Sequence, residues 1–260
     1  MRGPLITLLT DFGRKDGYVA AMKGVMLQRC SEARFLDISH EVAPQSIAEA
    51  AFILDTTFDA FPKETLHVVV IDPGVGSSRA ILAVAVAGQQ VLAPDNGVLS
   101  LLLSRYPRHT IHRVNNEALY AKRVSATFHG RDIFAPVAAY LANGGQLSSV
   151  GPPVESFIKL SMLAARVENE YLYGQIIYVD GFGNAVSNIA GSALPDDPFC
   201  VEIADVCTVP FCTTYSEMSV GNALALLGSH GRLEIAVNSG NAAAQLGLTL
   251  GQLLRIPLSD

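Results

Sequence analysis

Charged residues are scarce in this chain. Asp, Glu, Lys and Arg make up 16% of its 260 residues, while hydrophobic residues make up 50%. This excess is enough for a large core, and it indicates that part of the surface is buried in an oligomer. The formal net charge is −6. Because a nucleic-acid-binding protein needs a basic face, we expect no nucleic-acid partner. A negative charge is compatible with a cationic small ligand.

The sequence also has no long apolar run and no paired cysteines. The apolar stretch in MRGPLITLLT is too short for a signal peptide or a membrane span, so we expect a cytoplasmic protein with no membrane partner. None of the four cysteines belongs to a C-x-x-C pair, and no histidine lies near Cys207 and Cys212. This spacing argues against zinc and is typical of reduced thiols.

The first part of the chain alternates strand and helix patterns, which is typical of a largely parallel sheet covered by helices. Predicted strands occupy residues 5–10, 33–39, 66–71, 80–86, 90–92 and 110–114. Predicted helices occupy residues 18–30 and 132–142, and two more begin at Pro44 and after Asn96. The length favours two domains. We assign residues 1–155 to an N-terminal α/β domain with a mainly parallel sheet.

The pattern changes after a stretch rich in Gly, Ser and Pro at residues 143–156, which indicates a boundary or linker. Short strand-like segments follow at residues 170–180, 199–206, 232–238 and 252–258, with one convincing helix at 220–227. Short strands of this kind are typical of a small antiparallel β-domain. We therefore predict a smaller, barrel-like β-domain over residues 166–260.

Polar residues gather where the predicted elements of the first domain end. In VVVIDPGVGSSR, a strand of β-branched residues runs into Asp72 and a turn built on Gly74 and Gly76, and Arg79 follows. The segment lacks the spacing and the lysine of a phosphate-binding loop. Ligands collect at the carboxyl ends of strands in open α/β sheets. Similar junctions supply the other candidates: Asp11, Asp16, Asp95, Asn96, His129, Arg131 and Asp132.

These residues also have other interpretations, as structural residues or as metal ligands. Asp72 is also suited to capping a turn, and a lone histidine such as His129 is often structural, although its place before a glycine at a helix start favours a role. Several aspartates and a histidine also suit a two-metal hydrolase. Against a metal, Arg79 and Arg131 bring fixed positive charge, and no second histidine is nearby. His40 is interpreted as structural.

In the second domain the segment VDGFGNAVSNI is distinctive. Its two glycines permit a close approach of the backbone to a ligand. Asn184 offers a donor and an acceptor to a base edge, and Phe182 offers a ring for stacking. The alternative is an ordinary hairpin with a bulge. The later segment GSHGRLEIAVN adds Ser229, Glu234 and Asn238.

Taken together, seven segments resemble the S-adenosylmethionine hydroxide adenosyltransferase family, which shares its fold with the bacterial enzymes that make fluoro- and chloro-adenosine. The segments are TDFGRKDGYVAAMKG, DISHEVAPQSIAEAAFIL, VVIDPGVGSSR, LAPDNGVLS, FHGRDIFAPVAAYLA, DGFGNAVSNI and LEIAVNSGNAA. They follow one another in order over nearly the whole chain.

The resemblance implies hydrolysis of S-adenosyl-L-methionine to adenosine and L-methionine by attack of water or hydroxide at the ribose C5′. It implies a homotrimer, with each site between the N-domain of one subunit and the C-domain of its neighbour. We expect no cofactor, and the arginines among the acids lead us to expect no metal. Asp72, Arg79 and His129 match the set that marks the hydrolysing branch. The resemblance makes Asp11 the ribose-binding residue. It also assigns substrate contacts to Asp16, Phe182, Asn184, Tyr215, Ser229, Glu234 and Val237.

One position departs from the fluorinating relatives, which have an arginine near the methionine carboxylate where this chain has His230 after Ser229. The halogenating relatives also replace the acid and the histidine of the marker set and carry an extra loop, and this chain shows no obvious insertion. Two alternatives to hydrolysis remain at this point. One is a halide-dependent adenosyltransferase of the chlorinase kind, and the other is a non-catalytic sensor of adenosine or S-adenosylmethionine.

Overall fold

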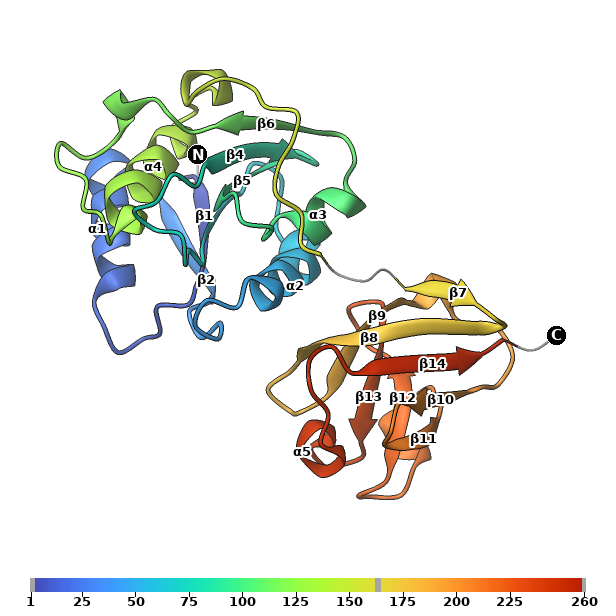
Figure 1. The fold of residues 1–260 in the computed structure, drawn as a ribbon. Coiled ribbons are helices and arrows are strands. Elements are labelled where there is room, and N and C mark those ends of the chain that lie inside the picture. Colours follow the sequence, from blue (N-terminus) through green and yellow to red (C-terminus); the bar gives the residue numbers. More distant parts are fainter. Residues whose placement is uncertain (1–2, 162–164, 259–260) are drawn as a thin grey trace. The chain divides into compact units, whose positions relative to one another are not determined.

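A computed structural model describes residues 3–161 and 165–258. The chain divides into two compact units, Met1–Leu160 and Ser161–Asp260 (Figure 1). The strands of the first unit are β1 (Leu5–Thr10), β2 (Arg34–Ser39), β3 (Leu66–Val70), β4 (Ile81–Val86), β5 (Gln89–Pro94) and β6 (His109–Arg113). Its helices are α1 (Tyr18–Arg29), α2 (Ile47–Thr57), α3 (Ser100–Arg105) and α4 (Ala135–Ala142). The predicted α/β class is confirmed.

The sheet of the first unit has the strand order β2-β1-β3-β5-β4-β6. Strand β1 pairs in parallel with β2 and β3, and β3 pairs in parallel with β5. Strand β4 then runs antiparallel to both β5 and β6. The carboxyl ends of β1, β2 and β3 therefore lie at one edge of the sheet, where ligands collect in folds of this kind.

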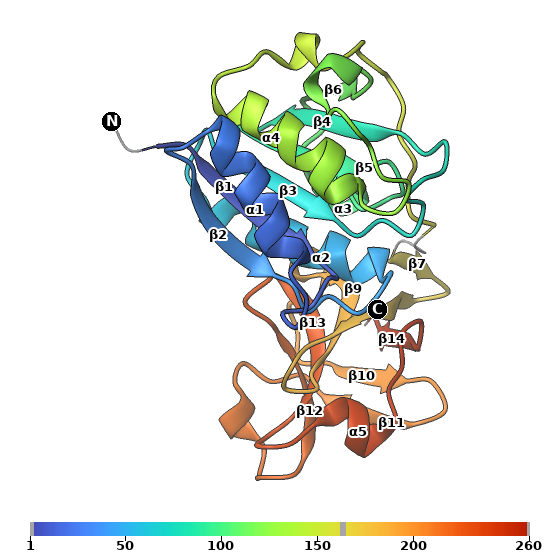
Figure 2. The ribbon, with the colours of Figure 1, turned by 90° about the vertical axis from the view of Figure 1, so that its left-hand side faces the viewer.

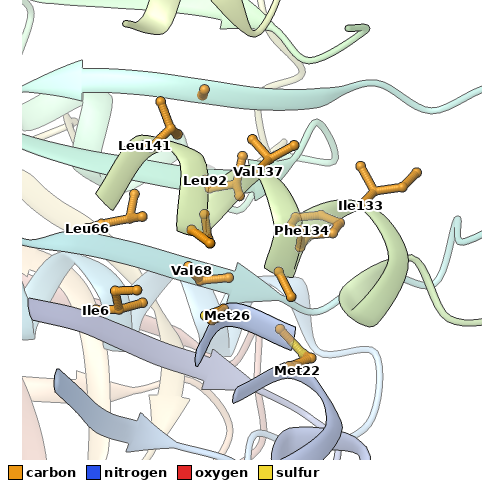
Figure 3. Close-up of a cluster of buried hydrophobic side chains, with 14 of the residues drawn as sticks. Ile6, Met22, Met26, Leu66, Val68, Leu92, Ile133, Phe134, Val137 and Leu141 are labelled. Atoms are coloured by element: carbon orange, nitrogen blue, oxygen red, sulfur yellow. The ribbon is translucent and has the colours of Figure 1, made fainter. Parts of the chain in front are cut away.

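Helices cover both faces of this sheet. Successive side chains of a strand point to opposite faces. Val68 and Val70 accordingly pack with α1 and α4, and Val69 and Ile71 pack with α2 and α3. Figure 2 shows α1 beside α4 across the sheet, and Figure 3 shows the side chains buried beneath them. Burial on both faces explains why β3 is apolar except for the buried His67.

The segment at residues 143–156 packs against the first unit. Val150 is fully buried in the core beneath α4, and the backbone N–H of Val154 donates to the carbonyl of Ile111 over 2.9 Å. The carbonyl of Pro152 accepts from the N–H of Arg113 over 2.9 Å. The stretch that indicated a linker in the sequence is therefore held along β6.

The second unit is an antiparallel sheet with the strand order β11-β10-β14-β8-β9-β13-β12, and β7 pairs with β8. Phe211, next to β11, forms a bridge with Ala225 in β12, so the two ends of the sheet approach each other and nearly close a barrel. Its strands are β7 (Arg166–Glu168), β8 (Tyr171–Val179), β9 (Ala185–Ala190), β10 (Cys200–Ile203), β11 (Cys207–Pro210), β12 (Ala223–Leu227), β13 (Arg232–Val237) and β14 (Leu253–Pro257). The predicted barrel-like domain is confirmed.

The helix predicted at residues 220–227 is wrong. This segment forms β12, which pairs antiparallel with β13 from Ala223 to Leu227. The apolar run is short and lies between Gly221 and Gly228, and periodicity alone does not separate a buried strand from a buried helix at that length. Among residues 165–258 the α-helix is α5 (Ala242–Leu246), which the sequence did not reveal. The side chain of Asn241 caps it, accepting from the N–H of Ala244 over 2.7 Å.

Candidate active site

A cavity of about 640 Å³ opens at the carboxyl ends of β1 and β3 in the first unit. Asp11 follows β1 directly, and Asp72 lies two residues beyond the end of β3. The cavity is lined by Asp11, Phe12, Tyr18, Pro44, Gln45, Val70, Asp72, Pro73, Val75, Ser125, Thr127, Phe128, His129, Gly130 and Arg131. Three of the predicted junctions thus meet around one space: the segments after β1 and β3, and the segment that leads into α4. Pro44 and Gln45, from the segment after β2, also line it.

Asp72 and His129 line this cavity, and Arg79, which is not among the lining residues, connects them. The Nε of Arg79 donates to both carboxylate oxygens of Asp72, over 2.8 and 3.0 Å, and its Nη2 also contacts Oδ2. The same Nη2 lies 2.8 Å from Nδ1 of His129. The side chains of Arg79 and Asp72 are only 11% and 5% exposed. The ion pair is therefore shielded from water, which strengthens it relative to a surface pair.

The contact with Arg79 fixes the hydrogens of His129. A guanidinium donates and never accepts, so Nδ1 of His129 must be the acceptor. Burial lowers the pKa of His129, and the charge of Arg79 lowers it further, while Asp72 and Asp132 act in the opposite direction. The ring is consequently neutral near pH 7, and its one N–H is at Nε2.

A glycine explains how two separate loops meet at this group. Gly76 has φ +78°, a conformation that L side chains rarely adopt, and a Cβ built on it would overlap the carbonyl oxygen of Ala126. The loop from Asp72 to Arg79 therefore lies directly against the loop that carries His129. The DPGVG motif needs its second glycine for this approach.

Asp132 anchors the loop that precedes His129. This buried carboxylate accepts the backbone N–H of Ser125 over 2.8 Å and the Nε of Arg131 over 2.6 Å. The hydrogen bond from Arg131 is the main reason that the pKa of Asp132 is lowered. His129 itself lies at the start of a π-helical turn, Gly130–Phe134, which leads into α4. Such turns occur often at functional sites.

Asp11 and three aromatic residues also line the cavity. Oδ2 of Asp11 accepts the backbone N–H of Gln45 over 2.8 Å. The rings of Phe12, Tyr18 and Phe128 pack on one another with centroids 5.0–5.9 Å apart. The predicted substrate residue Asp16 is exposed and is not among the residues that line the cavity.

In the second unit, Asp180 organises the turn that contains Phe182 and Asn184. Its Oδ1 accepts the backbone N–H groups of both residues, over 2.9 and 2.8 Å, and its Oδ2 accepts the side-chain amide of Asn184 over 3.1 Å. Asn184 is buried, while the ring of Phe182 is 80% exposed. An exposed aromatic ring beside a fixed amide is suited to a flat ligand.

A second group in this unit joins Tyr215, His230 and Glu234. The hydroxyl of Tyr215 donates to Oε1 of the buried Glu234 over 2.6 Å, and Nε2 of His230 lies 3.0 Å from Oε2. Burial, the bond to Glu234 and the charges of Glu234 and Asp180 raise the pKa of Tyr215 to about 12. Ser229 is exposed beside this group, and Val237 is buried at the end of β13.

Several lining residues were not singled out in the sequence, although they adjoin those that were. Phe12 follows Asp11, and Phe128 precedes His129. Asp95 and Asn96 do not line the cavity. The amide of Asn96 instead donates to the carbonyl of Ile71, next to Asp72, over 2.8 Å, and Asp95 accepts the N–H of Ile158 over 2.8 Å.

Within residues 3–161 and 165–258, no group of three or more His, Cys, Asp or Glu side chains is placed to hold a metal ion. No helix in the same part of the chain is long and apolar enough to cross a membrane.

Family models and curated relatives match this chain over most of its length, and they agree on one family. Residues 6–151 match the model of the SAM hydroxide adenosyltransferase N-terminal domain, and residues 174–255 match that of the C-terminal domain. An (R)-S-adenosyl-L-methionine hydrolase of Salinispora tropica is 36% identical over 257 residues, covering 97% of both chains. The hydrolase of the same name from Thermus thermophilus is 35% identical over 260 residues, covering 96% of this chain and 98% of the relative.

More distant relatives include a fluorinase of Actinopolyspora mzabensis, which is 24% identical over 298 residues and is covered to 98% on both sides. Among solved structures, a conserved protein of Thermotoga maritima superposes with a TM-score of 0.90 and 37% sequence identity. That match covers 97% of this chain and 99% of the other.

Proposed function

The chain belongs to the S-adenosylmethionine hydroxide adenosyltransferase family, and we infer that it is an enzyme that hydrolyses S-adenosyl-L-methionine to adenosine and L-methionine. Within the structure, the observation that supports this activity best is that Asp72 and His129, which line the cavity, are joined by Arg79. The group combines a shielded carboxylate, a fixed cation and a neutral imidazole. These are the parts needed to orient a water molecule and to accept its proton.

The reaction joins a neutral or anionic nucleophile to a sulfonium cation. Attack of hydroxide at the ribose C5′ cancels charge, so a pocket that excludes water favours the reaction over the separated ions. A carbon–oxygen bond forms at C5′, the carbon–sulfur bond breaks, and its electron pair leaves with the methionine sulfur. The water loses one proton.

We assign the proton to Asp72 and the orientation of water to His129. Nδ1 of His129 is occupied by Arg79, so the free position of the ring is a donor, Nε2–H. Oδ1 of Asp72 accepts one hydrogen bond from Arg79 and can accept a further one, whereas Oδ2 already accepts two. General-base assistance contributes roughly 10²–10⁴ in rate, so in-line positioning of the water must supply much of the remainder.

The other contacts are proposed from the same resemblance. Asp11 binds the ribose hydroxyls, Asn184 and the backbone near Val237 bind the adenine, and Phe182 packs on its face. These residues are divided between the two units of the chain. In a cyclic trimer, the heterologous interface brings two different surfaces together, so one subunit completes the pocket of the next.

Subunit mixing tests the shared sites. An Asp72→Ala subunit and an Asn184→Ala subunit are each expected to be inactive as homo-oligomers. Mixed trimers should regain part of the activity, because some of their interfaces carry neither substitution. Mixed trimers that form and stay inactive would show that the two residues act within one chain.

The activity itself is tested by incubating the protein with S-adenosylmethionine in ¹⁸O-labelled water with chloride present, and separating the products by chromatography. We expect adenosine with the label on its 5′ oxygen. The name of the relatives specifies the (R) form, so the two sulfonium epimers should be supplied separately, and we expect turnover of the (R) epimer. Chloro-adenosine as the main product would identify a halide-dependent enzyme. Binding without turnover of either epimer would identify a sensor.

A cytoplasmic location remains a prediction. It is supported by the four cysteines, Cys30, Cys200, Cys207 and Cys212, which are all unpaired.

A further inference from the structure

A series of polar side chains in contact with one another ends at Thr10, the residue before Asp11. It starts at Lys23 on α1, whose Nζ donates to Oδ2 of Asp37 over 2.7 Å. Oδ1 of Asp37 lies 3.2 Å from Nε2 of His40, at ion-pair distance, and Nδ1 of His40 lies 2.9 Å from the hydroxyl oxygen of Thr10. Burial alone would raise the pKa of Asp37, but the hydrogen bonds and charges of Lys23 and His40 outweigh it and lower that pKa.

The topology of the sheet brings this series of side chains close to the cavity. His40 directly follows β2, and Thr10 is the last residue of β1. Because β1 and β2 are parallel neighbours, the two residues lie side by side at the edge of the sheet where the cavity opens. His40 is only 4% exposed and is not among the residues that line the cavity, so it acts on a ligand only through its neighbours.

His40 fastens the segment from Thr10 to Gly13 at both ends. At one end its ring contacts the hydroxyl of Thr10, whose oxygen also accepts the backbone N–H of Phe12 over 3.3 Å. At the other end the backbone carbonyl of His40 accepts the N–H of Gly13 over 2.7 Å. Between these two points lie Asp11 and Phe12, which line the cavity.

We propose that His40 is a positioning residue for substrate binding, which together with Thr10 sets the place of Asp11 and Phe12 in the cavity wall. This inference rests on the proposed function, because it concerns the substrate of that same cavity. Asp11 and Phe12 contact parts of the nucleoside that do not react. Losing their alignment therefore weakens the ground state and the transition state alike, which raises KM and leaves kcat nearly unchanged.

The same strand offers a matched control. Thr7, three residues before Thr10 in β1, pairs through its hydroxyl with Nδ1 of His67 over 2.8 Å. Both threonines and His67 are fully buried, but Thr7 and His67 are not among the residues that line the cavity. Thr7→Val and Thr10→Val thus each remove a buried threonine–histidine contact from β1 while keeping the volume of the side chain. Only Thr10→Val removes contacts that hold Asp11 and Phe12 in place in the cavity.

The experiment compares these two variants for stability, for the steady-state constants of S-adenosylmethionine hydrolysis and for adenosine binding by calorimetry. Thr7→Val loses one hydrogen bond, whereas Thr10→Val also loses the bond that the N–H of Phe12 donates to Thr10. At about 0.5–1.5 kcal/mol for each lost bond, Thr10→Val should lose about twice as much stability as Thr7→Val. We expect Thr10→Val to raise KM and the adenosine dissociation constant about tenfold, equivalent to 1.4 kcal/mol, with kcat within about threefold of wild type. Thr7→Val should leave both constants unchanged.

Substitutions of His40 separate its two contacts. An asparagine amide reaches the position of Nδ1 and a glutamine amide that of Nε2, so His40→Asn should keep the contact with Thr10 and restore most of the affinity lost in His40→Ala. His40→Gln should restore little. Equal KM values for Thr7→Val and Thr10→Val, or a loss in kcat as large as the rise in KM, would overturn the inference. A wild-type protein that binds adenosine but hydrolyses nothing would refute the proposed function instead, and the adenosine affinities would still decide the role of His40.

Discussion

The close approach of two loops at Gly76 makes a quantitative prediction for Gly76→Ala. At φ +78° an alanine carries the cost of a left-handed conformation, roughly 1–2 kcal/mol. Its Cβ would also overlap the carbonyl oxygen of Ala126 and lie 3.3 Å from the carbonyl carbon. A backbone atom cannot turn aside as a side chain can, and overpacking of this kind costs about 1–3 kcal/mol. Gly76→Ala should therefore lose roughly 2–5 kcal/mol of unfolding free energy in total.

The loss of activity should exceed what the loss of stability explains. To relieve the overlap, the loop that carries Asp72 and Arg79 must retreat from the loop that carries His129. The 2.8 Å contact between Arg79 and His129 joins these two loops directly. Since a displacement of about 1 Å at a catalytic group can cost 10²-fold in rate, we expect kcat to fall at least tenfold.

The assay is urea unfolding together with kcat for S-adenosylmethionine, measured where the variant stays folded. Gly144→Ala is the matched control: Gly144 has φ +84°, but a Cβ built on it meets nothing within 4 Å. It should lose only the conformational cost of roughly 1–2 kcal/mol and keep its kcat. If the two variants were equally stable and equally active, the contact between the loops would not be what assembles the site.

Three further predictions concern pH, metals and the second unit. Because burial and the charge of Arg79 lower the pKa of His129, kcat/KM should fall on the acid side with a midpoint below 6.5, where the ring gains a proton, and Arg79→Gln should move that midpoint upward. A midpoint above 6.5 in the wild type would contradict the neutral histidine. Activity should survive exhaustive EDTA treatment, since Arg79 places a fixed cation beside the carboxylate; loss restored by a divalent ion would point to a metallohydrolase. Tyr215→Phe removes the hydroxyl that donates a hydrogen bond to the buried Glu234. Urea unfolding should therefore show that the unfolding free energy falls by about 1–3 kcal/mol. An unchanged unfolding midpoint would show that the contact contributes nothing to stability.

The sequence predicted those parts of the fold that local pattern determines. The β-branched run before Asp72 marked a strand buried on both faces, and the glycines after it marked a turn. Alternating strands and helices then predicted the sheet. The prediction for the apolar run in β12 was wrong because such a short run suits a strand and a helix about equally. Its pairing with β13 makes it a strand. That pairing is a tertiary contact, and five apolar residues carry no sign of it.

The sequence singled out the acidic and basic residues of the candidate site, but not the contacts that hold them in place. Asp72 and His129 were singled out because each stands at an element end beside a proline or a glycine, and Arg79 because it follows Asp72 by seven residues in the same motif. That Arg79 would bridge the other two side chains depends on the approach at Gly76, which only the folded chain shows. His40 was interpreted as structural because no turn motif lies beside it in the sequence. Its partner Thr10 comes from a neighbouring strand 30 residues away.

The central claim is that the Asp72, Arg79 and His129 group activates the water that attacks the substrate. The most direct test is the single-turnover rate of adenosine formation by Asp72→Asn, together with its affinity for S-adenosylmethionine. Asparagine keeps the size and the hydrogen-bonding ability of the side chain but cannot take up the proton. The rate should fall by at least about tenfold to a hundredfold with the affinity nearly unchanged. A rate equal to that of wild type would contradict the assignment.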